Sequence, residues 1–298
     1  MKPIRHRSLK QLNKTQRLVP GFFLAPSVIG VLLFFILPFF VVIYYSFVNN
    51  PVQKEWVGLE NYVKLFENSA FRIAMGNTLK FSLIAVPLVV VLSMLLAFWL
   101  NSGLHLKSQL RSSFLTPIMV PTASIVLIWQ VLFDYKGAIN HVINSLGGGS
   151  VEWLKSGAGM FVIILLFIWK NIGYCMVLFM AGMGNIPGEL VEAAQLDGAG
   201  GWKTFWHVKV RYLSPTFVFT TILSLINSFK IFREVYMLTG DYPVSELYML
   251  QHYMNNTFAS GDYQKLSTAA IYMCLIMIVI MLILFAIEHH FGKDIESE

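Results

Sequence analysis

Polar side chains inside long apolar runs are the groups of this 298-residue chain that could do chemistry. Lys170 stands near the middle of one run, where a lysine costs about 2.5–3.5 kcal/mol on membrane-insertion scales. Its neighbours combine aromatic rings with an amide. This mixture suits a sugar, because ring faces stack on apolar C–H groups and amides bind hydroxyls. With a second polar group further along the chain, the candidate substrate pathway is Trp169, Lys170, Asn171, Tyr174, Asn227 and Lys230.

Two interpretations of Lys170 stay open: it faces a wet cavity, or it pairs with an acidic group of a second subunit. Asn227 and Lys230 are three residues apart and share a helix face, and a pore position is slightly favoured for Asn227. Arg233 and Glu234 follow near the end of the same run, and we expect them at a solvated helix end near the outer mouth.

Other chemistries find no support in the sequence. No Gly-x-x-x-x-Gly-Lys-Ser/Thr phosphate loop occurs, and no set of cysteines and histidines has zinc spacing. Cys175 and Cys274 fall inside apolar runs, where they fit as small packing residues. We therefore expect no catalytic residue, no metal site and no cofactor bound by this chain.

The segments that must position these side chains have the apolar composition of membrane-spanning helices. The chain is 56% hydrophobic and 13% charged, whereas soluble domains carry about 25% charged residues. Apolar runs of about 18 residues or more predict transmembrane helices. We expect an all-α integral membrane fold with six transmembrane helices, at about 22–47, 79–100, 114–133, 160–183, 213–231 and 269–287.

The basic residues set the expected orientation. The net charge of +6 does not come from a folded basic surface, which excludes nucleic acid as a partner. With the N-terminus inside, the inner segments hold twelve lysines and arginines and the outer segments six. Positive charge is retained on the cytoplasmic side, so both termini are predicted to be cytoplasmic. The expected organisation is a basic tail at 1–19, a transmembrane domain at 20–291 and a short tail at 292–298.

The inner loop at 184–212 carries a polar, small-residue island between two apolar runs. Pro187 suits a helix start, and carboxylates in the first turns complement the helix dipole. Gly198 can end that helix in a left-handed conformation, before an aromatic second helix. The pattern predicts a helix–turn–helix elbow that docks a partner, although a surface helix in a long loop would also fit. The predicted docking residues are Glu189, Glu192, Ala193, Ala194, Asp197 and Gly198.

This elbow resembles a known signature. Glu192-Ala193-Ala194, three residues and then Gly198 is similar to the EAA motif of the membrane subunits of ABC importers. The extended pattern from Ile186-Pro187 to Thr204-Phe205 resembles the carbohydrate branch. Elsewhere, Gly58-Leu59-Glu60-Asn61-Tyr62 resembles the first, maltose-transporter-like permease of sugar importers. One position departs from the pattern, since Arg211 stands where the family places a proline.

The resemblance implies a type I ABC importer permease fold in which the elbow is a cytoplasmic coupling helix. It implies three partners besides membrane lipid: a second permease subunit, a cytosolic ATP-binding subunit dimer that holds ATP and magnesium, and an extracellular sugar-binding protein. The location would be a bacterial or archaeal cell membrane and the cargo a sugar or oligosaccharide. Alternatives are a non-sugar or anionic cargo, such as a glycerol phosphate-like solute, and, from other classes of protein, a membrane channel or a membrane-embedded enzyme.

Overall fold

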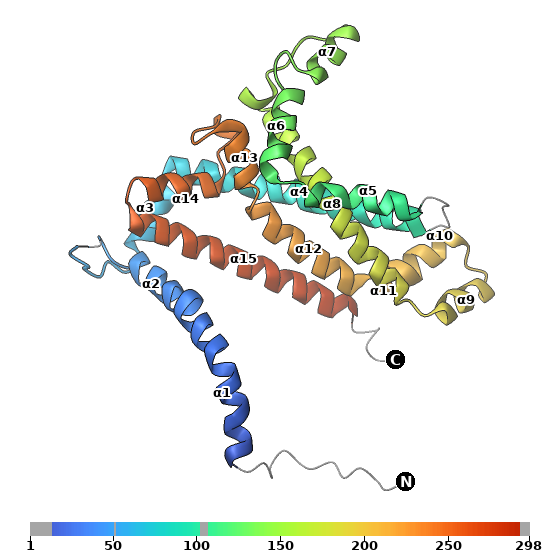
Figure 1. Cartoon of the computed structure of the whole chain (residues 1–298), viewed down its shortest axis with the longest axis horizontal. Coiled ribbons are helices and arrows are strands. Elements are labelled where there is room, and N and C mark those ends of the chain that lie inside the picture. Colours follow the sequence, from blue (N-terminus) through green and yellow to red (C-terminus); the bar gives the residue numbers. More distant parts are fainter. Residues whose placement is uncertain (1–13, 51, 102–106, 293–298) are drawn as a thin grey trace. The chain divides into compact units, whose positions relative to one another are not determined.

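The computed structural model describes residues 14–50, 52–101 and 107–292, and their regular structure is helical apart from one bridge between Val48 and Trp56 (Figure 1). The expected tails therefore lie largely outside the described residues. The chain forms two compact units. Unit 1 comprises Met1–Leu65 and Asp262–Tyr272, and unit 2 comprises Phe66–Gly261 and Met273–Glu298.

Among the described residues, five helical segments are long and apolar enough to cross a membrane. They confirm the all-helical membrane fold expected from the apolar runs. The first is α1, a π-helical turn η2 and α2 in succession, and the fourth is α12 followed by α13. The bounds are α1 Lys14–Val31, η2 Leu32–Ile36, α2 Leu37–Ser46, α4 Ser69–Asn101, α8 Gly159–Gly184, α12 Ser214–Phe229, α13 Phe232–Thr239 and α15 Tyr263–Gly292.

The third expected span, at 114–133, is broken rather than continuous. It consists of α5 (Lys107–Met119) and α6 (Thr122–Leu132), which are bent by 97°. Pro121 lies at the break with an extended ψ of 136°. Its ring removes a backbone donor and disfavours helical geometry in Val120 before it. If α5 and α6 together form one membrane span, they supply the sixth span.

Helix α4 is longer than the apolar run that predicted it. It begins ten residues before position 79, so Arg72 and Asn77 belong to the helix. The connections also contain short helices. These are α3 (Glu60–Glu67), α7 (Ala138–Ser145), η3 (Trp153–Lys155), η5 (Ser245–Leu247) and α14 (Leu250–Ala259).

The core of unit 2 lies between α4 and α8, which run side by side in Figure 1 with α12 and α5 packed against them. The rings of Phe81 and Phe167 meet edge to face with their centres 5.4 Å apart. Gly173 brings α8 close to α5, since an added Cβ would lie 2.6 Å from the carbonyl carbon of Phe114. Such close contact matters in lipid, because van der Waals packing drives association there in place of the hydrophobic effect.

In unit 1, side chains of α3 hold the end of α2. The amide of Asn61 donates to the carbonyl oxygens of Ser46 and Val48, both at 2.9 Å. The Tyr62 hydroxyl lies 2.9 Å from the Ser46 hydroxyl. Asn61 and Tyr62 of the Gly58–Tyr62 motif therefore fix the chain's exit from its first span.

Candidate functional site

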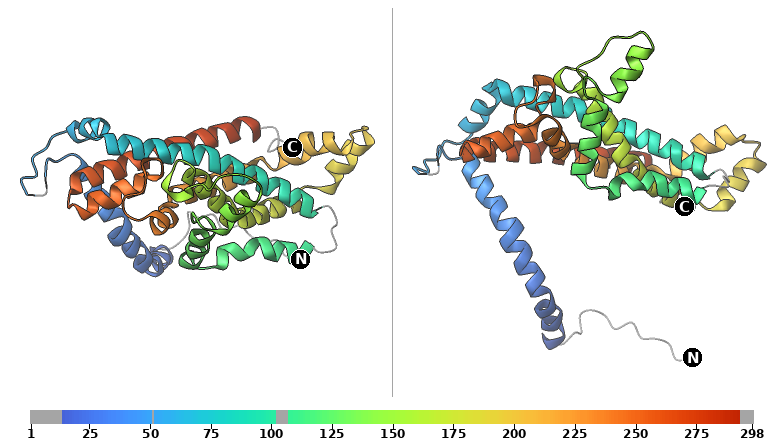
Figure 2. Two further views of the ribbon diagram at one scale, coloured as in Figure 1. Left: turned by 90° about the horizontal axis from the view of Figure 1, so that it is seen from above. Right: turned by 45° about the horizontal axis from the view of Figure 1, so that its top comes forward.

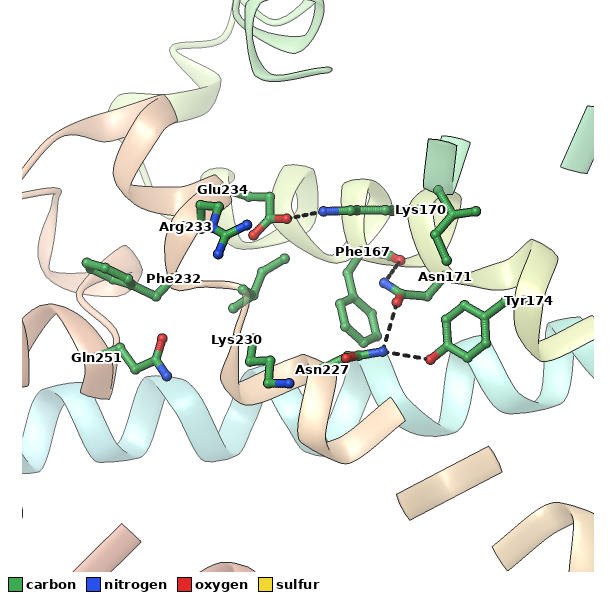
Figure 3. Close-up of a pocket in the computed structure, with 12 residues that line it drawn as sticks. Phe167, Lys170, Asn171, Tyr174, Asn227, Lys230, Phe232, Arg233, Glu234 and Gln251 are labelled. Atoms are coloured by element: carbon green, nitrogen blue, oxygen red, sulfur yellow. Dashed lines mark hydrogen bonds and ion pairs between the residues drawn. The ribbon is translucent and has the colours of Figure 1, made fainter. Parts of the chain in front are cut away.

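A cavity of about 520 Å³ lies in unit 2, lined mainly by α8, α12 and α13 (Figure 3). We call it the central cavity. Trp169, the sixth candidate residue, lies outside the lining; it is 41% exposed and its ring centre is 6.1 Å from that of Trp129. Five of the six predicted pathway residues line this one space: Lys170, Asn171, Tyr174, Asn227 and Lys230.

Helix geometry explains why these residues meet. Lys170 and Tyr174 are four positions apart on α8, and Asn171 is three positions before Tyr174, so both Lys170 and Asn171 neighbour Tyr174 on the helix surface. Asn227 lies in the last turn of α12, and Lys230 caps that helix with its N–H on the Asn227 carbonyl, at 3.0 Å. The short break before α13 turns the following residues toward the same cavity.

Hydrogen bonds orient the neutral polar groups. The Asn227 amide donates to the Tyr174 hydroxyl at 2.9 Å and to the Asn171 side-chain oxygen at 3.4 Å. The Asn171 amide in turn donates to the Phe167 carbonyl at 2.7 Å. Figure 3 shows these hydrogen bonds linking α8 to α12. The cavity wall thus presents amides and a phenol in fixed orientation, groups that can exchange hydrogen bonds with hydroxyls.

Lys170 forms an ion pair with Glu234 of α13 and a 3.3 Å hydrogen bond with the Thr122 hydroxyl of α6. The expectation of a solvated helix end for Glu234 is wrong, because only 5% of this residue is exposed. A lysine within a span needs a compensating charge, and Glu234 supplies it from the same chain instead of a second subunit. Both also line the central cavity, so Lys170 faces a cavity, as one interpretation expected, and is paired within its own chain.

Two further cations line the central cavity. Lys230 and Arg233 are exposed, and neither makes an ion pair with another residue in the described part of the chain. The central cavity therefore carries two positive charges beyond the neutralised pair of Lys170 and Glu234.

The predicted docking helix is α9 (Gly188–Leu196), which directly follows the end of α8. Gly198 adopts φ +78°, as the sequence predicted. The N–H of Ala199 bonds to the Ala194 carbonyl at 2.9 Å, and that of Gly198 to the Gln195 carbonyl at 3.0 Å. These two bonds form a Schellman motif, which ends the helix sharply and satisfies its last carbonyls.

No residue of α9 is buried, and Figure 2 shows α9 and α10, in yellow, standing off from the helices they join. Glu189, Glu192, Ala193 and Asp197 are exposed, and Ala194 is half-buried. Leu196 is 89% exposed. An apolar residue and three carboxylates thus share a small surface with no basic residue in α9 to neutralise them.

The second half of the elbow is anchored. It runs through α10 (Gly201–Thr204), η4 (Phe205–Lys209) and α11 (Val210–Tyr212). The ring of Phe205 packs edge-on against Phe98 of α4, with ring centres 4.3 Å apart. Helical structure continues through Arg211 and breaks at Leu213, just before Pro215. The chain is therefore helical at position 211, where the family pattern has a proline.

Residues 89–297 match the protein family described as "Binding-protein-dependent transport system inner membrane component". The chain belongs to this family. The arabinooligosaccharides transport system permease protein AraP of Bacillus subtilis is 32% identical, over 77% of this chain and 74% of AraP. The trehalose/maltose transport system permease protein MalF of Thermococcus litoralis is 30% identical, over 80% of this chain and 82% of MalF.

A solved relative confirms the family fold. One chain in the crystal structure of a bacterial ABC transporter, involved in the import of the acidic polysaccharide alginate, superposes with a TM-score of 0.79. The two are 21% identical, and the match covers 93% of this chain and 96% of that one. This match shows the expected type I importer permease fold. The similarity to AraP and MalF shows that the chain is a sugar-type ABC permease.

Proposed function

We propose that this chain is one membrane-spanning subunit of an ATP-driven importer that carries a sugar or oligosaccharide. It would form the translocation path with a second permease subunit. An extracellular binding protein would deliver the cargo, and a cytosolic ATPase dimer holding ATP and magnesium would dock on α9. The coupling elbow and both termini would then lie on the cytoplasmic side, in a bacterial or archaeal cell membrane.

The observation that carries this proposal is that one helix bears both functional regions. Helix α8 lines the central cavity at Lys170–Tyr174 and ends at Gly184, directly before α9. Ten residues separate Tyr174 from Gly184, about 15 Å at 1.5 Å per residue. A displacement of α9 by a partner would therefore reach the cavity along a single rigid element.

The surface of α9 supports docking of a basic partner. Its exposed carboxylates at Glu189, Glu192 and Asp197 would attract a positively charged cleft, and Leu196 would supply an apolar anchor. The small side chains of Ala193 and Ala194 would allow the partner surface to approach closely. Hydrolysis of ATP is assigned to that partner, because the transport chain itself shows no phosphate loop in its sequence.

The lining of the central cavity supports a hydroxyl-rich cargo. Amides and a phenol offer both donors and acceptors, and the names of AraP and MalF point to saccharides. Lys230 and Arg233 keep an anionic cargo as the second candidate, and the transporter of the acidic polysaccharide alginate shares the fold.

Reconstitution tests the proposal. The intact importer, made from this chain with its second permease and ATPase, is placed in liposomes with the binding protein. Labelled saccharides should accumulate only with ATP inside. Glu192→Lys should abolish uptake while ATP hydrolysis persists, because it reverses a docking charge. Glu67→Lys, a matched change on an exposed carboxylate at the end of α3, should leave uptake unchanged. Equal uptake by wild type and Glu192→Lys would contradict the role of α9.

A further inference from the structure

A second cavity, of about 610 Å³, lies in unit 2 at the opposite end of α8 from α9. Its walls are the end of α6 with residues 133–135, the segment 152–155 at η3, and residues 238–244 at the end of α13 and beyond. We call it the α6–α13 cavity. Its volume is in the range of natural small-molecule sites, about 300–1,000 Å³. None of its residues was among the predicted pathway set.

The lining joins aromatic faces to hydrogen-bond acceptors. Tyr242 is 78% exposed and Tyr135 is 52% exposed, although each ring adjoins the hollow. Trp153 lines the same space, with its ring centre 5.7 Å from that of Phe133. Aromatic faces are electron-rich and attract the polarised C–H groups of a sugar ring. Exposed rings of this kind gain burial when a ligand covers them.

Carboxylates complete the chemistry. Asp134 and Glu152 line the α6–α13 cavity, and an ionised carboxylate only accepts hydrogen bonds. Sugar hydroxyls donate them, so the two groups match. With Lys155 also in the lining, the charges sum to minus one, which favours a hydroxyl-bearing ligand over an anion at this position.

The walls are held in place by one buried side chain. Asn140 of α7 is only 1% exposed. Its amide donates to the carbonyls of Tyr135 at 3.0 Å and Val151 at 2.8 Å. Its oxygen accepts from the Val151 N–H at 3.0 Å and from the Trp153 indole at 3.1 Å. The segments that carry Tyr135 and Trp153 are thus tied together before any ligand arrives, which lowers the entropic cost of binding.

The two cavities share a helix. Glu234 of α13 lines the central cavity and Leu238 of the same helix lines the α6–α13 cavity. Four residues of helix span about 6 Å. The Gln130 amide donates to the Met237 carbonyl at 3.1 Å and fastens α6 to α13 between them. The two cavities therefore lie about one helical turn apart along α13.

We propose that the α6–α13 cavity is a second saccharide subsite, which binds the next sugar unit of an oligosaccharide whose first unit occupies the central cavity. This assignment rests on the proposed import function. It makes the chain selective for cargo length: a monosaccharide reaches one subsite, and a longer saccharide reaches both.

The test uses the intact importer in liposomes with its binding protein. Uptake is measured for the mono-, di- and trisaccharides of the malto and arabino series. Tyr135→Ala with Tyr242→Ala should raise KM for the trisaccharide about tenfold, the scale of about 1.4 kcal/mol that aromatic contacts supply. The same variant should leave monosaccharide uptake within about twofold. Leu146→Ala, which removes an 82% exposed apolar side chain from the end of α7 outside the cavity, is the matched control.

Each outcome is decisive. A wild type that takes up no saccharide refutes the proposed import function itself. A wild type that takes up only monosaccharides, or a double variant that slows all lengths equally, overturns the second subsite alone. Affinity of the ligand-free binding protein for the importer is measured in parallel and should not change. Weaker binding in the double variant would instead make the cavity a docking site for that protein and overturn the proposal.

Discussion

Replacing Glu234 with glutamine should destabilise the protein far more than the loss of one charge from an exposed ion pair. The variant keeps the size of the side chain but leaves the ammonium of Lys170 without its carboxylate. Only 22% of the Lys170 side chain and 7% of that of Glu234 are exposed. Removing one partner of such a buried pair costs about 3–5 kcal/mol, because the remaining charge is desolvated and uncompensated.

The chain contains a matched control. Lys64 and Glu60 form an ion pair at 2.5 Å, four residues apart on α3, with 62% and 53% of their side chains exposed. Exposed pairs contribute at most about 1 kcal/mol, so Glu60→Gln should have a small effect. Unfolding free energies of both variants are to be measured on the intact importer by detergent titration followed by circular dichroism.

A double variant separates the ion pair from general damage. Lys170→Met with Glu234→Gln removes both charges and should recover most of the loss, since neutral replacements of a buried pair are often tolerated. If Glu234→Gln costs no more than Glu60→Gln, the ion pair between α8 and α13 does not stabilise the protein. If the double variant is as unstable as the single one, charge compensation is the wrong explanation.

Three further predictions concern single positions. Gly198→Val should allow ATP hydrolysis without uptake in liposomes, because a residue with a side chain is strained by about 1–2 kcal/mol at φ +78° and the turn after α9 would change shape. Uptake that stays coupled to hydrolysis would contradict the role of this turn. Gly173→Ala should reduce the yield of assembled importer on size exclusion, since α5 must move away from the new Cβ, whereas Gly184→Ala meets open space and should assemble normally. Burial lowers the pKa of His252 to about 4 from 6.5, so the unfolded chain binds the proton first and stability should fall as pH drops from about 6.5 to 4. His252→Phe should flatten that dependence in thermal unfolding, and parallel curves would contradict it.

Sequence reasoning succeeded where a local rule decides the structure. Run length located the spans, because lipid leaves the backbone few alternatives to helix. Gly198 took the predicted left-handed conformation because only a residue without a side chain adopts it freely. Polar residues within one helical turn, such as Lys170 and Tyr174, had to share a side, and both line the central cavity.

The remaining features depend on long-range contacts. Proline alone does not predict a break: Pro87 and Pro117 lie inside helices, whereas the chain turns by 97° at Pro121. Glu234 is 64 residues from Lys170, and only the packing of α13 against α6 brings it into reach. A useful signal was present in the sequence, since a carboxylate and a lysine in different spans each need a compensating partner in the membrane.

The distance in sequence between Lys170 and Glu234 also sets an order of events during synthesis. A ribosome adds about 5–20 residues per second, so the 64 residues between them take about 3–13 s. For that interval α8 carries a lysine whose carboxylate has not yet been made. Until α13 is translated, only water or other protein groups near Lys170 can lower the cost of that charge in the membrane.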